Sequence, residues 1–409
     1  MIRAQHLVVV AGAALAASAL AGAPDSDRNY SAELKADASS RAGAGIASLA
    51  EPESSVKLGG WMQFRYYMNF RDDPSSGSFH DSGFTNGFEA TRTRLTATGN
   101  VMSKDLTFKV EGEFSKNTGD FSLLDAYVDY KYENGISARA GQFKLPLLRQ
   151  ELVSDTLQLT VNRGLANEVF SQKRSQGVQG AYRAESWGLR AALSDGLNTL
   201  NTAYTDPRES DFAITARFEF KGSGDWKQFD DFTAWRGQDA GWLAGVAAHY
   251  QHDGNTASAG APVQRQIIQY TADFGYEGDG WNVFAAFIGR HTDPDGGGAE
   301  NLDDFGAQIQ GGVFVSNQVE LFAAWDGVFP DAGYGTALDE DFHAITVGAN
   351  WYLFEKSHAA KVTGDVVWYL GKTTENALVS GIAGSNSIGL RPSNEDNQIA
   401  VRLQFQLIF

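Results

Sequence analysis

One stretch of alternating sequence, residues 122–174, limits most strongly the folds that this chain can adopt. Its first arm has the period-two pattern of a β-strand with one apolar and one polar face. The apolar face holds Leu124, Ala126, Val128, Tyr130 and Tyr132, and the polar face holds Asp125, Tyr127, Asp129 and Lys131. The chain turns at Glu133–Gly135, returns as a second strand and breaks at Pro146, where a long polar loop begins. A short turn followed by a long polar loop is typical of hairpins in outer-membrane β-barrels.

The same alternation recurs along the rest of the chain and predicts sixteen strands. They are expected at residues 56–70, 87–99, 106–115, 122–132, 136–143, 176–184, 187–194, 211–221, 241–251, 265–276, 281–290, 304–315, 318–328, 342–354, 360–371 and 397–409. Short connections alternate with longer polar ones, except that 222–240 is long for a turn and 116–121 is short for a loop. Such alternation is expected when the two rims of a barrel face different compartments. The sequence therefore predicts an all-β fold, a sixteen-stranded antiparallel transmembrane β-barrel with short periplasmic turns and long extracellular loops.

The two ends of the sequence indicate export to the outer membrane. Residues 1–21 carry Arg3, an apolar run and the small-x-small tripeptide Ala19-Leu20-Ala21, which predicts a signal peptide. Residues 22–55, rich in Ala, Ser, Asp and Glu, are expected to be a flexible periplasmic segment, and residues 56–409 the barrel. No later stretch is apolar for long enough to form a transmembrane helix, so any span must be built of strands. The last strand ends on Phe409, which resembles the signal read by the barrel-assembly machinery.

Composition argues against several other function classes. The chain has no cysteine, which removes disulfides, thiolate metal sites and thiol catalysis. Six histidines follow the predicted signal peptide, at positions 80, 249, 252, 291, 343 and 358, but no nucleophile motif accompanies them. Asp293-Pro-Asp295 and the glycines after it lack the ligand spacing of a calcium loop. An acidic pI of 4.8 disfavours nucleic-acid binding. We expect no enzyme activity, no cofactor and no metal.

Several segments resemble the phosphate-selective porin O/P family. They are V-K-L-G-G-W-M-Q-F-R at 56–65, F-E-A-T-R-T-R-L at 88–95, L-L-D-A-Y-V-D-Y at 123–130, A-R-A-G-Q-F-K-L-P at 138–146, and the closing V-R-L-Q-F-Q-L-I-F. The resemblance spans Val56–Phe409. It implies a sixteen-stranded trimeric porin in outer-membrane lipid, whose third extracellular loop, here residues 146–173, folds inward to narrow the pore. It also implies a ladder of lumenal arginines that guides anions.

Strand phase supplies candidates for that ladder. Arg92 and Arg94 lie two apart on one strand and point the same way, and a guanidinium offers fixed charged donors to an oxyanion. Further lumen-facing cations are Arg183, Arg190, Arg217, Arg290 and Arg402. The residues predicted to line the pore and contact anions are Arg65, Arg92, Arg94, Lys109, Arg139, Lys144, Arg149, Arg163, Lys173 and Arg174. Rings of such side chains select anions by charge in pores.

Acidic residues oppose this charge. Residues 196–409 carry 28 Asp and Glu against 12 Lys and Arg, while residues 56–195 carry 16 against 17. Lumenal Glu111, Glu113, Asp125 and Asp129 flank the predicted cations, and the loop has Glu151, Asp155 and Glu168.

We expect passive diffusion of small anions such as phosphate through a loop-narrowed constriction. Two alternatives stay open: a general or non-anion-selective porin, and a barrel that serves mainly as a surface anchor or receptor.

Overall fold

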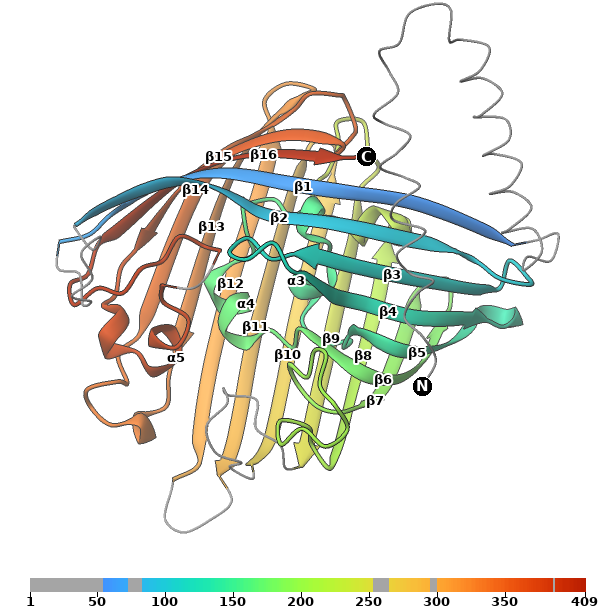
Figure 1. Cartoon of the computed structure of the whole chain (residues 1–409). Helices are drawn as coiled ribbons and strands as arrows, with labels where there is room; N and C mark the ends of the chain where they lie inside the picture. Colours follow the sequence, from blue (N-terminus) through green and yellow to red (C-terminus); the bar gives the residue numbers. More distant parts are fainter. Residues whose placement is uncertain (1–53, 73–82, 253–264, 295–299, 385–386) are drawn as a thin grey trace, which may run out of the picture. The chain divides into compact units, whose positions relative to one another are not determined.

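Sixteen antiparallel strands form a closed barrel in the computed structural model, which describes residues 54–72, 83–252, 265–294, 300–384 and 387–409 (Figure 1). The predicted sixteen-stranded antiparallel β-barrel is confirmed. The expected signal peptide, the segment at 22–53, His80 and residues 295–298 lie outside the described residues.

The strands follow the predicted order, and most of their ends lie within three residues of the predicted ones. They are β1 (Ser55–Phe70), β2 (Phe84–Asn100), β3 (Leu106–Phe114), β4 (Phe121–Lys131), β5 (Ile136–Lys144), β6 (Arg174–Arg183), β7 (Trp187–Ser194), β8 (Phe212–Ser223), β9 (Gly241–His252), β10 (Arg265–Gly278), β11 (Trp281–Pro294), β12 (Leu302–Phe314), β13 (Val319–Phe329), β14 (Phe342–Tyr352), β15 (Ala360–Tyr369) and β16 (Gln398–Ile408). Short helices lie in the connections: η2 (Glu133–Gly135), α3 (Arg149–Leu152), η3 (Asp155–Leu157), α4 (Leu165–Phe170), η4 (Trp226–Asp230), η5 (Ala332–Tyr334), η6 (Thr373–Glu375) and α5 (Ala377–Ser380).

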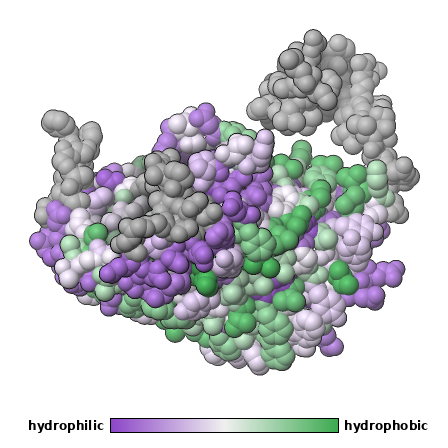
Figure 2. Space-filling view, turned by 90° about the horizontal axis from the view of Figure 1, so that it is seen from below, coloured by the Kyte–Doolittle hydropathy of each residue, from purple (hydrophilic) through white to green (hydrophobic). Residues whose placement is uncertain are grey.

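Burial alternates along the strands as the period-two pattern predicts. On β1, Phe64 is 42% exposed on the outer surface, whereas its neighbour Arg65 is fully buried on the inner one. Large apolar side chains are exposed in this way on all sixteen strands, and Figure 2 shows broad hydrophobic areas on the outer surface. No helix among the described residues is long and apolar enough to cross a membrane.

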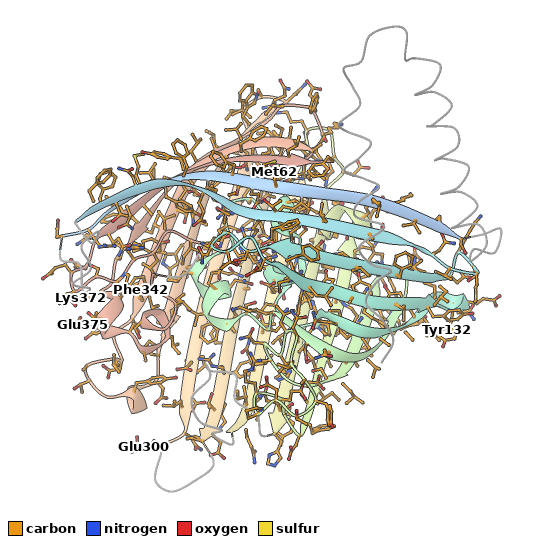
Figure 3. The ribbon with its side chains drawn as sticks, in the orientation of Figure 1. Met62, Tyr132, Glu300, Phe342, Lys372 and Glu375 are labelled. Atoms are coloured by element: carbon orange, nitrogen blue, oxygen red, sulfur yellow. The ribbon has the colours of Figure 1, made fainter. Side chains whose placement is uncertain are left out.

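The two rims of the barrel differ. Short turns, including η2 and residues 184–186, gather at one rim, called here the turn rim, and most long connections gather at the other, the loop rim. The exceptions are the long connection 224–240 at the turn rim and the short connection 115–120 at the loop rim. In Figure 3, Tyr132 beside η2 lies at the opposite end of the barrel from Lys372 and Glu375 of the β15–β16 connection. The predicted asymmetry of the connections is therefore present in the fold.

The barrel closes between β1 and β16. Gly60 and Phe409 exchange two main-chain hydrogen bonds of 2.8 and 2.9 Å at the end of this antiparallel ladder. A Cβ at position 60 would lie 2.7 Å from the main-chain oxygen of Arg94 and 3.0 Å from the Phe409 ring. Only glycine lets the strands approach this closely.

Two connections occupy part of the barrel interior. The first, called here the inner loop, is residues 145–173 between β5 and β6 and contains α3 and α4, which Figure 1 shows inside the ring of strands. It packs its apolar side chains against apolar inner-wall residues of β10–β15; the cluster includes Leu145, Leu148, Leu165, Phe170, Ile267, Ile288, Val328, Phe342 and Val367. The second, called here the inner turn, is residues 224–240 between β8 and β9. Its Phe232 packs with Val153 and Leu159 of the inner loop and with Phe284 and Phe322 of the wall.

Candidate functional site

The inner loop is fastened to the wall through its main-chain carbonyl groups. Four wall side chains from β1, β14, β15 and β16 donate hydrogen bonds of 2.8–3.0 Å to four successive parts of the loop. These are Arg65 to the carbonyl of Val161, Asn350 to Leu159, Lys361 to Gln158 and Gln406 to Thr156. A chain segment without regular structure can be buried only when its polar groups find such partners. The wall of β14–β16 and β1 therefore fixes where the loop lies.

Arg65, the first predicted rung of the ladder, serves this fastening. Its side chain is fully buried, and its Nε donates to Gln404 at 2.7 Å. Its two terminal nitrogens donate to the carbonyls of Val161 in the inner loop and Ser387 in the β15–β16 connection, at 2.8 and 2.9 Å. All of these acceptors are neutral. Arg65 thus holds two long connections against β1.

Asp155 joins the inner loop to β2. Its carboxylate accepts from Arg94 at 2.8 Å and from Arg163 of the same loop, and it lies 3.5 Å from Arg92. Burial alone would raise the pKa of Asp155, but Arg163, Arg92 and Arg94 together hold this pKa well below its usual range. The group therefore stays charged, and the predicted rung pair Arg92 and Arg94 binds a carboxylate of the loop.

Glu151 makes the second charged anchor of the loop. It lies 3.3 Å from Arg163 and 3.5 Å from Lys144, and it accepts from Asn167 at 3.1 Å. Burial would raise the pKa of Glu151, but Arg163 and Lys144 lower it to about 2. The acids of the inner loop are thus matched to the cations beside them.

A cavity of about 580 Å³, called here the vestibule, lies beside the inner loop. It runs along the inner face of β3–β8 and reaches the turn rim near Tyr132 and Gly135. Eight cationic side chains line it: Arg94, Lys109, Lys131, Arg139, Lys144, Arg174, Arg183 and Arg190. Five acids line it: Glu111, Asp125, Asp129, Asp155 and Glu219. The lining carries a formal charge of +3, in a chain whose net charge is −17.

Most vestibule cations are paired with acids on neighbouring strands. Arg139 binds both oxygens of Asp129, at 2.7 and 2.9 Å, and Arg190 binds Glu219 at 2.8 Å. Asp125 accepts from Lys109 at 2.7 Å and also from Arg174. The possible neutralisation seen in the sequence is therefore present, although it leaves an excess of cations.

The inner turn crosses the barrel at the turn rim. At one side Trp226 donates to the carbonyl of Ala184 at 3.1 Å. At the other side Thr233 contacts the hydroxyl of Tyr352 at 3.2 Å, and Asp231 pairs with His358 at 3.2 Å. The sequence marks this connection only by its length and by four aromatic residues, at positions 226, 229, 232 and 235.

A smaller cavity of about 130 Å³, called here the side cavity, lies between the inner loop and the inner turn. Its charged lining is Arg149, Arg183, Arg190, Glu219 and Asp230, and its apolar lining is Leu152, Val153, Trp226, Phe229 and Leu243. Leu152, Arg183, Arg190 and Glu219 line both cavities, so the two adjoin.

The ten predicted anion-contacting cations fall into four groups. Arg94, Lys109, Arg139, Lys144 and Arg174 line the vestibule. Arg149 lines the side cavity. Arg65, Arg92 and Arg163 hold the inner loop in place, and Lys173 at the end of that loop is exposed. Of the other vestibule cations, Arg183 and Arg190 were predicted to face the lumen, and Lys131 was placed on the polar face of its strand.

The described residues contain no group of three or more His, Asp or Glu side chains placed to hold a metal ion. His249 is a buried wall residue of β9 and contacts Thr215 at 2.7 Å and Gln251 at 3.1 Å.

Comparison with known proteins gives one family and a set of similar barrels. Residues 64–264 match the family model described as phosphate-selective porin O and P. A search of curated proteins found no match. Among solved structures, the anion-selective porin from Comamonas acidovorans is 14% identical, with 87% of this chain and 100% of that chain covered and a TM-score of 0.59. The outer-membrane channel DcaP of Acinetobacter baumannii is also 14% identical, with 88% and 99% covered and a TM-score of 0.58. OmpT of Vibrio cholerae in its trimer form is 13% identical, with 87% and 99% covered and a TM-score of 0.56. At this identity the solved structures show a shared barrel fold.

Proposed function

We propose that this chain, which belongs to the phosphate-selective porin O and P family and forms an outer-membrane channel, lets small anions diffuse passively along its vestibule. Phosphate is among the anions expected to pass. The observation that carries this proposal is the vestibule lining, which has eight cations against five acids within a strongly acidic chain.

An excess of cations in a narrow cavity attracts anions even when most of those cations are paired. Low-dielectric walls focus the field, so the formal charge of +3 acts on a solute inside the vestibule more strongly than the distant acidic loops do. Lys131 and Arg183 line the vestibule, and among the described residues neither has an acid within ion-pair distance. These two side chains supply the charge that is free to meet a solute.

The same pairing argues for passage of phosphate without tight retention. Carboxylates already accept from Arg139, Arg174 and Lys109, and they occupy the donors that a phosphate group would need. A carboxylate bound bidentately neutralises the charge of a guanidinium and occupies two of its five N–H donors, which weakens its attraction for a second oxyanion. We therefore infer weak, fast contacts with phosphate in the vestibule.

Planar-bilayer recording tests the proposal. In a KCl gradient the reversal potential should show anion selectivity, and Lys131→Gln combined with Arg183→Gln should move it toward zero or beyond. Arg208→Gln is a matched control, because Arg208 pairs with Asp206 in the β7–β8 connection and lines neither cavity. A cation-selective wild-type channel would contradict the proposal. A reversal potential near zero would favour a general porin, and a protein without conductance would favour a surface anchor or receptor.

We also propose that the chain acts as a homotrimer in outer-membrane lipid and is assembled by the barrel-assembly machinery through Phe409. The trimer form of OmpT supports the oligomeric part, because its barrel is similar. Analytical ultracentrifugation in detergent measures the mass of the assembly, and a monomer under all mild conditions would contradict the trimer.

A further inference from the structure

The side cavity has both charged and apolar side chains in its lining. The inner loop supplies Arg149, Leu152 and Val153, and the inner turn supplies Trp226 and Phe229. Because the cavity adjoins the vestibule, a solute that travels along β3–β8 has access to it. The cavity is thus placed beside the proposed path.

The lining of the side cavity carries more positive than negative charge. Three arginines oppose Glu219 and Asp230, and Glu219 is already bound by Arg190 and Arg217 at 2.8 Å each. The formal charge of the lining is therefore +1.

Arg149 is the group that most needs a partner. Its side chain is only 7% exposed, and one terminal nitrogen donates to the carbonyl of Phe229 at 2.6 Å. Among the described residues, its Nε has no hydrogen-bond partner and no acid lies within ion-pair distance. Its guanidinium carbon also lies 5.8 and 5.7 Å from the ring centroids of Phe229 and Phe232. A buried guanidinium without an ion-pair partner is costly. Arg183, across the cavity, contacts only the ring of Trp226, 5.0 Å from its guanidinium carbon, among the described residues.

The remaining lining suits an apolar body of the size of one ring. Five apolar or aromatic side chains, beside five charged ones, line a volume of about 130 Å³. In another protein, an apolar cavity of about 150 Å³ binds benzene. An inorganic oxyanion would gain nothing from these walls, whereas a phenyl ring would be removed from water.

We propose that the side cavity binds a small aromatic monocarboxylate, with benzoate as the simplest example. The carboxylate lies between Arg149 and Arg183, and the ring packs against Leu152, Phe229 and Leu243. This inference rests on the proposed function, and it gives the channel a class of organic solute in addition to inorganic anions.

Isothermal titration calorimetry on the full chain in detergent tests the site. Benzoate, acetate and inorganic phosphate are titrated separately. Benzoate should bind about tenfold to a hundredfold more tightly than acetate, because burial of a phenyl ring adds that much affinity. Phosphate should bind more weakly than benzoate. Equal affinity for benzoate and acetate, or tighter binding of phosphate, would overturn the proposal.

Three variants locate the site. Arg183→Gln should weaken benzoate about tenfold, the loss of one charge-assisted hydrogen bond, while the contact of Arg149 with the inner turn stays intact. Leu152→Phe should weaken benzoate by filling the cavity, without a change of charge. Arg208→Gln should leave binding unchanged. Benzoate affinity that is the same in the first two variants as in the wild type would place the ligand elsewhere.

The outcome is separable from that of the proposed function. Anion-selective reversal potentials together with no preference for benzoate would overturn only the side-cavity site. Cation-selective potentials would overturn the anion channel itself.

Discussion

Acid should release the inner loop from the wall, because Glu151 is held charged in the barrel interior. The side chain is 6% exposed and lies between Arg163, Lys144 and Asn167. Burial would raise the pKa of Glu151, but Arg163 and Lys144 lower it from 4.5 to about 2. In a released loop the carboxylate would be exposed to water, and its pKa would return to 4.5.

The difference in pKa gives the size and the direction of the effect. At about 1.4 kcal/mol for each pH unit, it stabilises the docked loop by about 3 kcal/mol at pH 7. Because the pKa of Glu151 is lower in the docked state, this contribution is fully present above pH 4.5 and is lost as the pH falls toward 2. At pH 3 about 1 kcal/mol remains. Asp155, whose pKa is also held low, adds to the loss at still lower pH.

Limited proteolysis and conductance measure the release. Glu151→Gln should raise the population of the released loop about a hundredfold at neutral pH, so trypsin at pH 8 should cleave after Arg163, which is 6% exposed in the docked loop. Wild-type channels should become noisy in bilayers between pH 4 and pH 2.5. Glu168→Gln is the matched control, since its carboxylate accepts, among the described residues, a hydrogen bond only from Asn162. Two results together would refute the reasoning: a Glu151→Gln protein that resists trypsin as well as the wild type does, and a wild-type current that stays steady down to pH 2.5.

Three further substitutions test the framework of the barrel. Gly60→Ala should lower the temperature at which the barrel unfolds, read from heat-dependent gel mobility, because its Cβ would lie 2.7 Å from a carbonyl oxygen of β2 and 3.0 Å from the Phe409 ring; an unchanged transition would contradict the close packing. Phe232→Ala should cost about 3–5 kcal/mol in urea unfolding and increase single-channel conductance, because it leaves a cavity under the inner turn; unchanged conductance would show that the turn does not limit flow. Asp365→Asn should cost about 3–5 kcal/mol, because it removes the charged partner of Arg402, which is 3% exposed; urea unfolding with an unchanged midpoint would contradict a buried pair.

The strands and their inward-facing residues were predictable, because a period-two pattern fixes the face of every residue of a strand once one residue is placed. Once Phe64 and Phe70 are placed outside, Arg65 and Asn69 must face inward, and the structure buries them. Strand phase does not, however, predict which residue of the neighbouring strand pairs with a given residue. Arg139 and Asp129 are direct partners across β4 and β5, and this pairing depends on a register that the turn fixes.

The inward course of the inner turn was harder to foresee. Its length was visible, but a long connection folds inward only when the wall offers a matching surface. For the inner turn that surface includes Phe284 of β11 and Phe322 of β13, two apolar residues on the lumenal phase of their strands. Apolar residues at positions that should face water are the signal that the sequence carries for an occupied lumen.

The one-sided filling of the barrel divides its wall into two kinds of surface. Along β10–β16 the inner side chains pack into a protein interior, where charges such as Asp365 and Arg402 must pair with one another and a substitution acts on folding. Along β3–β8 the inner side chains face a solvent-filled space, where a charge can change without emptying a packed core. The solute preference of such a barrel can therefore change through a few substitutions along β3–β8. The opposite side of the wall meanwhile keeps the inner loop in place.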